Sequence, residues 1–181
     1  MESDERFRRR IQFAPEAFSC AGPRGAYIYY ALGVDPSIVD AEAFSPEDGR
    51  VHVVVAAADG GQVSDGVIAK LVNRLRRDDT VPLTDWVSVR RAEVVDYRVT
   101  ATVTFPRGPD PDLVRTRVEE SVAAYAADRY RVGATVFRSG LIAAAQVGGV
   151  ESVTLEEPST DLVCGPAQIA HLSGLAITTA V

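Results

Sequence analysis

The sequence contains few of the residues that form metal sites and disulfide frameworks. Only two of its 181 residues are cysteine and two are histidine. Cys20 and Cys164 lie far apart without a secretory signal ahead of them, so free buried thiols are a better interpretation than a disulfide. His52 and His171 have no second histidine, cysteine or carboxylate at ligand spacing. The sequence therefore predicts no metal and no cofactor.

Long hydrophobic runs are also lacking. No apolar stretch approaches the roughly 20 residues that a bilayer span needs. The N-terminal sequence MESDERFRRRIQ carries charges of both signs and has no apolar core. We therefore expect neither a transmembrane segment nor a secretory signal, and a protein that is made in the cytosol.

Excess positive charge is the third feature that the chain lacks. A formal net charge of -6 gives no general electrostatic reason to bind nucleic acid or an anionic membrane. Arginines cluster only at 8–10, 74–77 and 90–91, and we interpret the first cluster as an exposed helix face rather than a phosphate or acidic-partner contact. Lys70 is the only lysine and Asn73 the only asparagine, a bias that indicates a GC-rich genome. The remaining composition is that of a soluble globular protein.

No residue pattern in the chain matches a catalytic motif. A cysteine nucleophile would need one of the two histidines brought beside it by the fold. Glycine pairs at 60–61 and 148–149 lack phosphate-binding spacing, so we interpret them as turn glycines. Adjacent acids point in different directions in a regular helix or strand, which predicts solvated surface at 78–79, 119–120 and 156–157. We predict no catalytic residues and expect that the chain is not an enzyme.

Hydrophobic periodicity and capping residues predict helices and strands along the whole chain. Two helices are predicted in the first part of the chain, at 3–13, with Phe7 and Ile11 on one face, and at 26–32. A third is capped by Ser64 and has one apolar face of Val67, Ile68, Leu71, Val72 and Leu75. A fourth starts at Asp110-Pro111-Asp112 with Val114, Val118, Val122 and Tyr125 buried, and a fifth is capped by Ser139 with Leu141, Ile142 and Ala145 inward. The predicted strands are 38–44 and 51–58, joined by a turn at 46–49, then a tract at 87–105, 150–156 and 175–181, with 158–174 irregular.

The tract at 87–105 changes its alternation in the middle, where Arg91 and Glu93 interrupt the apolar parity. Such a switch means a bulge, a strong bend, or two strands that meet end to end. We place the passage between two halves of the protein there. The predicted fold class is α+β, with two small mixed or antiparallel β-sheet domains, each with helices packed on one face, joined by a long bent β tract. The predicted divisions are an N-terminal helix and linker at 1–23, a first α+β domain at 24–95 and a second at 96–181.

Two segments form a weak internal repeat. Residues 25–46 and 136–157 each read as a glycine before a short apolar helix (Gly25, Gly140), a turn and an alternating strand. A unit of this size cannot bury its own apolar face, so neighbouring strands and a longer helix must complete it.

Three tyrosines lie within four positions at Tyr27, Tyr29 and Tyr30. Their rings cannot all face one core. We therefore expect at least one of them to be exposed or to contact another subunit.

Four collinear segments resemble a known family. They are ESDERFRRRI at 2–11, APEAFSCAGPRGAYIYYALGVDPSIVDAEAFSPEDGRVHVVV at 14–55, PLTDWVSVRRAE at 82–93 and RSGLIAAAQVGGVESVTLEEPSTDLV at 138–163. Together they resemble the baseplate J-like proteins of contractile-tailed bacteriophages over nearly the whole chain. The most specific pieces are Ser-Asp before the arginine-rich helix, Ala-Gly-Pro before Gly-Ala-Tyr, and Pro-Leu-Thr-Asp before an alternating strand. None of these is a catalytic signature.

The resemblance implies a structural baseplate wedge component that acts in baseplate assembly and couples baseplate rearrangement to sheath contraction. It implies a place in the tail baseplate of a phage, prophage, R-type tailocin or other contractile injection system, assembled in the bacterial cytoplasm. The implied partners are other baseplate wedge and tail proteins and further copies of the chain, with no nucleic acid, membrane or small-molecule substrate. Family members carry a further region ahead of the Glu-Ser-Asp element, so the resemblance also implies a piece or a short variant of such a protein.

Two alternatives remain open from the residues themselves. One is a small-ligand-binding or regulatory α+β module, which a concave apolar pocket with convergent polar groups would favour. The other is an enzyme that uses Cys164 or Cys20, which a cysteine beside a histidine would favour. Exposed apolar patches would favour the wedge component.

Overall fold

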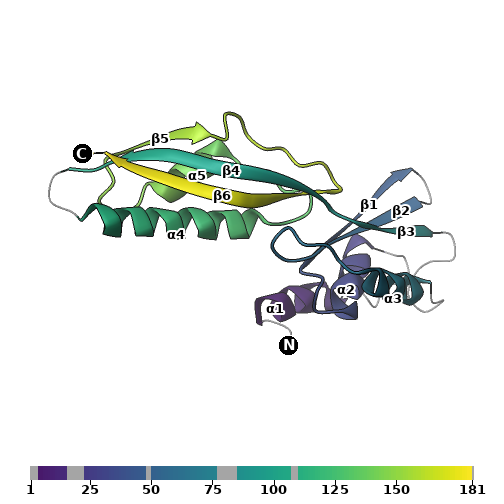
Figure 1. Ribbon diagram of the computed structural model, residues 1–181. Helices are drawn as coiled ribbons and strands as arrows, with labels where there is room; N and C mark the ends of the chain where they lie inside the picture. Colours follow the sequence, from purple (N-terminus) through teal and green to yellow (C-terminus); the bar gives the residue numbers. More distant parts are fainter. Residues whose placement is uncertain (1–3, 16–22, 48–49, 77–84, 107–109, 181) are drawn as a thin grey trace. The chain divides into compact units, whose positions relative to one another are not determined.

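The structure, a computed structural model, describes residues 4–15, 23–47, 50–76, 85–106 and 110–180 (Figure 1). The predicted order of helices and strands is confirmed, and so is the α+β class. The elements are α1 (Asp4–Phe13), α2 (Arg24–Val34), β1 (Asp40–Glu47), β2 (Arg50–Ala56), α3 (Asp65–Leu75), β3 (Trp86–Arg91), β4 (Glu93–Thr104), α4 (Pro111–Arg129), α5 (Arg138–Ala145), β5 (Ser152–Glu157) and β6 (Gln168–Ala180).

The chain divides into two compact units, each with its own three-stranded sheet. Unit 1 comprises Met1–Glu93 with Pro166–Gln168, and unit 2 comprises Val94–Gly165 with Ile169–Val181. The strand orders are β1-β2-β3 and β5-β4-β6. The parity switch in the long β tract is explained here, because β3 ends at Arg91 and β4 begins at Glu93 in a different sheet.

In unit 1, β2 is the central strand. It pairs antiparallel with β1 and parallel with β3. The pairing of Glu47 with Arg50 confirms the predicted hairpin, although two turn residues, 48–49, lie outside the described part. Helices α2 and α3 pack on the sheet, and the core between them is formed by Tyr27, Ile28, Ala31, Leu32, Ile38, Ala41, Ala43, Val53, Val55, Val63, Val67, Leu71 and Leu75.

In unit 2, β4 is the central strand and pairs antiparallel with β5. Hydrogen bonds at both ends, from Glu93 N to Ala167 O (2.9 Å) and from Phe105 N to Ala180 O (3.3 Å), show that β6 runs parallel to β4. Helices α4 and α5 lie on one face of this sheet (Figure 1). The core includes Tyr97, Val99, Ala101, Val103, Phe105, Val114, Val118, Val122, Ala126, Val136, Leu141, Ala145, Leu155, Cys164, Ala170 and Ile177.

The two sheets share one plan. In each unit a short helix leads into the antiparallel edge strand (α2 to β1, α5 to β5), the central strand leads into a helix (β2 to α3, β4 to α4), and the parallel edge strand comes last. The two segments of the weak repeat therefore occupy equivalent places. However, Gly25 and Gly140 lie inside α2 and α5 rather than before them.

The predicted irregular segment at 158–174 is wrong over its last part, because β6 already begins at Gln168. Leu172 and Leu175 both pack against the core of unit 2 although they are three residues apart. The alternation therefore changes parity at Ser173-Gly174, and a single period-2 pattern does not fit the whole strand. His171 consequently lies in a strand.

Two predicted details of the helices in unit 2 are also wrong. Ser139 does not cap α5, which begins at Arg138 with Phe137 in the N-cap position. The backbone N–H of Arg138 instead donates to a carboxylate oxygen of Asp161 (2.8 Å), 23 residues later. On α4, Ala126 is buried in the stripe and Tyr125 is only half-buried.

The caps predicted for α3 and α4 are confirmed. Ser64 Oγ accepts from Val67 N (3.4 Å), and Asp110 Oδ1 accepts from Asp112 N (3.0 Å) with Pro111 in the first turn. Each side-chain oxygen satisfies a backbone N–H that has no partner inside the helix.

We expect Asp110→Ala to lower the free energy of unfolding by about 1 kcal/mol, because the substitution removes the cap and a negative charge beside the N-terminus of α4. Asp110→Asn, which keeps the acceptor, is the matched control and should lose a smaller amount. Urea denaturation followed by circular dichroism measures both. Equal losses in the two variants would contradict the role of the cap.

The three clustered tyrosines do not all face the core, as predicted. Tyr27 is buried, and burial, with Asp85 as its hydrogen-bond partner, raises the pKa of its hydroxyl. Tyr29 and Tyr30 are half-buried, and the guanidinium groups of Arg10 and Arg74 lie 5.8 and 4.7 Å from their ring centres. Arginines of α1 and α3 lie beside the two rings that leave the core, and the expectation of contact with another subunit stays a prediction.

Candidate functional site

The histidines and the described cysteine are placed as structural residues. His52 Nδ1 lies 2.5 Å from Ser88 Oγ on β3, and His171 Nδ1 lies 2.7 Å from Asp96 Oδ1 on β4. Cys164 is buried, and burial raises the pKa of its thiol, which disfavours the thiolate that a nucleophile needs. Cys20 lies outside the described residues.

Metal-binding clusters and membrane-spanning helices are both lacking among the described residues. No group of three or more histidine, cysteine, aspartate or glutamate side chains in those ranges is arranged to hold a metal ion. None of the helices placed by the structure is long and apolar enough to cross a membrane.

The arginines of α1 are not simply an exposed helix face. Arg9 forms an ion pair with Asp40, a carboxylate that is buried at the start of β1. The guanidinium of Arg10 lies 5.5 Å from the ring centre of Phe7 as well as beside Tyr29. Two of the three clustered arginines therefore attach α1 to the rest of unit 1. A buried carboxylate requires such a partner, since an unpaired charge there is strongly unfavourable.

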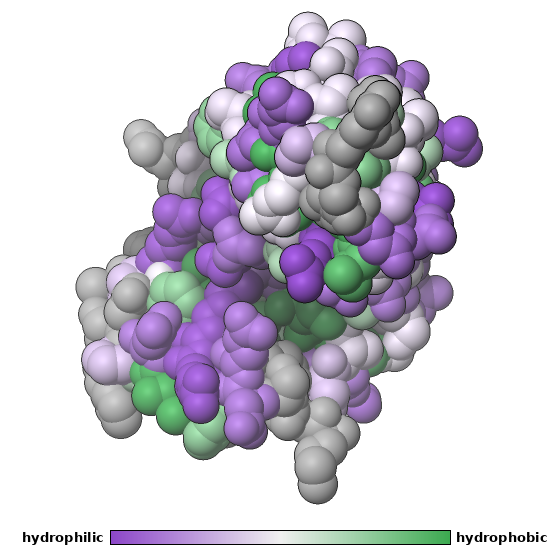
Figure 2. All heavy atoms as spheres, turned by 90° about the vertical axis from the view of Figure 1, so that its left-hand side faces the viewer, coloured by the Kyte–Doolittle hydropathy of each residue, from purple (hydrophilic) through white to green (hydrophobic). Residues whose placement is uncertain are grey.

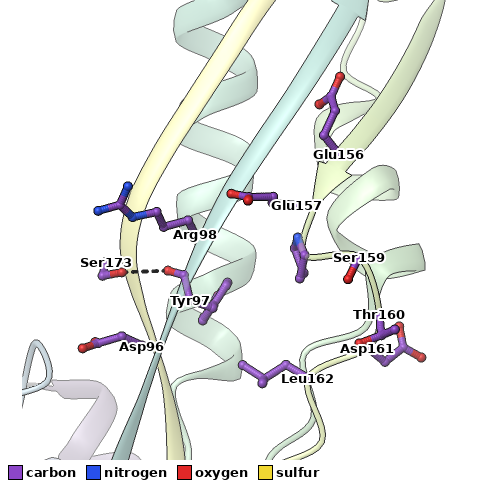
Figure 3. Close-up of a pocket in the computed structure, with 11 residues that line it drawn as sticks. Asp96, Tyr97, Arg98, Glu156, Glu157, Ser159, Thr160, Asp161, Leu162 and Ser173 are labelled. Carbon is purple, nitrogen blue, oxygen red and sulfur yellow. Dashed lines mark hydrogen bonds between the residues drawn. The ribbon is translucent and has the colours of Figure 1, made fainter.

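A groove of about 880 Å³ opens on unit 2 where β5 ends (Figure 3). One side of it is the first half of β4, and the other is the end of β5 with the loop that follows. The residues that line it are Asp96, Tyr97, Arg98, Glu156, Glu157, Pro158, Ser159, Thr160, Asp161, Leu162 and Ser173. Sequence reasoning missed this groove, because it depends on where β5 stops relative to β4.

A β-bulge shapes the upper rim of the groove. The register moves from Thr100 opposite Glu157 to Ala101 opposite Leu155, so Glu156 is the extra residue. Thr102 Oγ1 donates to Glu156 (2.9 Å), and Thr100 Oγ1 donates to Glu157 (3.3 Å). Both glutamates therefore reach the same outer face of the sheet. The prediction that adjacent acids point in different directions is wrong here, because it assumed a regular strand.

Arg138 fixes the side of the groove that is formed by the end of β5 and the loop after it. Its guanidinium donates to the carbonyl oxygens of Leu155 (3.0 Å) and Pro158, and its backbone N–H donates to Asp161. Charge-assisted bonds to backbone carbonyls are roughly twice as strong as neutral ones. The end of β5 and the loop are thus fixed to the start of α5.

The rim of the groove is mainly acidic and its floor is apolar. The lining residues include four carboxylates, Asp96, Glu156, Glu157 and Asp161, and one guanidinium, that of Arg98. The Asp96 carboxylate points toward β6, where it pairs with His171, and Asp161 accepts from the backbone N–H of Arg138. Figure 3 shows the Tyr97 ring and the Leu162 side chain between β4 and the loop. Burial, with smaller contributions from Tyr125 and Cys164, raises the pKa of Tyr97 to about 12, so its hydroxyl is neutral at ordinary pH.

Exposed apolar side chains form a second class of candidate site. Trp86 on the edge strand β3 is 74% exposed, and the guanidinium of Arg50 lies 5.5 Å from its ring centre. In unit 2, Val163 is 72% exposed and Phe137 is also exposed, next to the antiparallel bridge between Val136 and Leu162. On the face drawn in Figure 2, hydrophobic residues form small patches within a largely hydrophilic surface. Exposed apolar side chains like those of Trp86, Phe137 and Val163 are typical of protein–protein contacts.

Phe7 and Ile11 lie on one face of α1, as predicted, but that face is exposed. The two side chains are four residues apart and therefore adjacent on the helix surface. They add a third apolar surface, on unit 1.

Comparison with known proteins gives matches over both units. The family model described as Baseplate J-like central domain matches residues 19–91, and the one described as Baseplate J-like protein C-terminal domain matches residues 97–178. The chain is 32% identical over 180 residues to baseplate protein J of Escherichia phage P2. That similarity covers 99% of this chain and 60% of the length of the P2 protein.

Proposed function

Because the chain belongs to the baseplate J-like protein family, we propose that it is a structural component of the baseplate of a contractile phage tail or phage-tail-like particle. The observation that carries this proposal is the similarity to the P2 baseplate protein over both units. The chain spans about 60% of that protein's length. The exposed apolar side chains of Trp86 and Val163 fit a protein that is covered by neighbours in an assembly.

The proposed role includes baseplate assembly and the coupling of baseplate rearrangement to sheath contraction. Support comes from the way the backbone connects the two units. It passes between them three times, at 93–94, 165–166 and 168–169. Both β4 and β6 begin in unit 1 and continue in unit 2. This repeated backbone connection supports the proposed coupling role.

The proposed partners are other baseplate wedge and tail proteins, together with further copies of the chain in the symmetric baseplate. Nucleic acid, membrane and small-molecule substrates are not among them. The test is co-expression of the chain with the tail proteins encoded beside it, followed by size-exclusion chromatography with light scattering. A stable complex of defined mass is expected. A chain that forms no complex and instead retains a small molecule would favour the ligand-binding module.

The proposed function excludes catalysis. The buried thiol of Cys164, whose pKa is raised by burial, supports this part of the proposal. We expect the purified chain to turn over no ester, phosphate or glycoside substrate. Reproducible turnover that is lost in Cys164→Ser or His171→Asn would overturn it.

We expect Trp86→Ala to weaken binding to a partner tail protein by about 2 kcal/mol, or roughly 30-fold, if β3 lies in the interface. Trp86 has the exposure and the neighbouring arginine that are typical of strongly contributing interface residues. Isothermal titration calorimetry measures the change. Leu113→Ala, at an exposed apolar residue of unit 2, is the control. Unchanged affinity in Trp86→Ala would place the interface elsewhere.

A further inference from the structure

We propose that the groove on unit 2 binds an extended, basic peptide segment of a partner protein, which adds as a strand beside the first half of β4. The inference rests on the proposed function only in taking that partner to be another tail protein. Its basis is the unfinished side of the sheet, the shape of the groove and the charge of its rim.

The pairing between β4 and β5 stops before β4 does. Its register runs from Thr104 opposite Ser152 to Thr100 opposite Glu157, which is the last residue of β5. β4 itself begins seven residues before Thr100, at Glu93. The groove therefore lies where a continuation of β5 would be.

Hydrogen bonds on β4 show which backbone groups face the groove. The backbone N–H and C=O groups of the odd-numbered residues point toward β6. The N–H groups of Glu93 and Phe105 donate on that side, and the carbonyl oxygen of Tyr97 accepts from Ser173 Oγ (3.0 Å). The backbone groups of the even-numbered residues point the other way, since the carbonyl oxygen of Thr104 accepts from Glu151 N on the β5 side (2.7 Å). Because backbone groups alternate along a strand, the N–H and C=O of Asp96 and Arg98 point into the groove.

The shape of the groove fits an extended chain. Its two sides are consecutive segments, Asp96 to Arg98 on one and Glu156 to Leu162 on the other, so it runs along the strand direction. Arg138 and its bonds to β5 and the loop hold the second side in place. A site that is already formed loses little conformational freedom on binding. Addition of a strand to an open sheet side is a recurrent mode of peptide recognition.

The lining predicts the sequence pattern of the peptide. Successive side chains of an added strand point to opposite faces of the sheet. On the outer face they meet Glu156 and Glu157, and on the inner face they meet Tyr97 and Leu162. Because Glu156 and Glu157 both lie on the outer face of the rim, the outer positions favour lysine or arginine. The favoured pattern is therefore basic and apolar residues in alternation.

The test uses the full chain and three fluorescent hexapeptides. The first is Arg-Val-Arg-Val-Arg-Val, the second replaces every arginine with glutamate, and the third keeps the arginines but has N-methyl groups on alternate backbone nitrogens. Fluorescence anisotropy should show binding of the first and at least about tenfold weaker binding of the other two. N-methylation removes strand hydrogen bonds and keeps the charge, so it separates strand addition from simple attraction between opposite charges.

Two measurements on the protein complete the test. Binding of the first peptide should slow hydrogen exchange at the amides of Asp96 and Arg98, and the double substitution Glu156→Lys, Glu157→Lys should weaken binding about tenfold. Glu119→Lys, Glu120→Lys on α4 makes the same change in net charge away from the groove and is the matched control. Equal binding of the N-methylated peptide, or no binding at millimolar concentration, would overturn the proposal. Either result leaves the proposed function to its own test, the complex with a neighbouring tail protein.

Discussion

Leu71→Ala is expected to lower the free energy of unfolding of unit 1 by about 2–5 kcal/mol. Leu71 is fully buried on α3, in the core that α2 and α3 form with the first sheet. Truncation removes apolar contacts and leaves a cavity that the surrounding helices and strands fill only in part. Urea denaturation measures the loss. Asn73→Ala, at an exposed position two residues later on the same helix, is the control and should change stability by less than about 0.5 kcal/mol.

The same variant tests the proposal that 24–95 and 96–181 are separate domains. The separate cores of the two units support it. Hydrogen exchange should then become faster at amides of β2, such as Val53, and remain slow at amides of β4, such as Val99. Equal acceleration at both strands would mean that the two cores unfold together and would contradict the proposal.

Gly140→Ala is the second substitution with a large expected effect. A Cβ atom at this position of α5 would lie 2.2 Å from the hydroxyl oxygen of Tyr125 and 2.4 Å from its Cζ. That tyrosine accepts from Phe137 N (3.2 Å), so moving its ring away would break a contact between α4 and the start of α5. Overpacking of this kind typically costs about 1–3 kcal/mol. We therefore expect a lower melting temperature despite the better helix propensity of alanine.

A second glycine provides the matched control. Gly66 lies in α3, and a Cβ atom there would have no neighbour within 4 Å. Gly66→Ala should be neutral or stabilising, since alanine restricts the unfolded chain more than glycine does. Adding Tyr125→Ala to Gly140→Ala should cost less than the sum of the two single substitutions, because the clash is then absent. Additive losses would show that the contact with Tyr125 is not the cause.

The groove and the exposed surfaces have different consequences for assembly. Trp86 and Val163 provide apolar contact area, which stabilises association with little dependence on salt. The rim of the groove is charged and partly exposed, so its contribution to binding should fall as salt screens it. A baseplate protein that binds neighbours through both the apolar surfaces and the groove would keep the apolar contacts at high salt. It would lose the peptide bound in the groove first.

Local chemistry made much of the fold predictable from the sequence. The helix caps at Ser64 and Asp110 depend on a side chain and a backbone N–H two or three residues apart, so the residue types alone indicate them. The apolar stripes of α3 and of most of α4 follow from a period of 3.6 residues. The break at Ala92 was visible as a change in alternation. The family resemblance was carried by short turn and cap sequences of the same local kind.

The errors with the largest consequences lie where distant segments meet. Asp161 replaces Ser139 as the acceptor at the start of α5, and the bulge at Glu156 exists only against its partner strand β4. The early start of β6 depends on a change of parity that only pairing with β4 reveals.

The sequence by itself determined which segments are helices and strands, where most of them begin, and which family the chain resembles. Each of these depends on interactions within a few residues or on short motifs. Only the tertiary structure decided the strand order, the length of each pairing and therefore the groove. The register of β4 against β5 is set by contacts between residues far apart in the sequence, such as Thr100 and Glu157, and no local pattern records where one strand stops beside another.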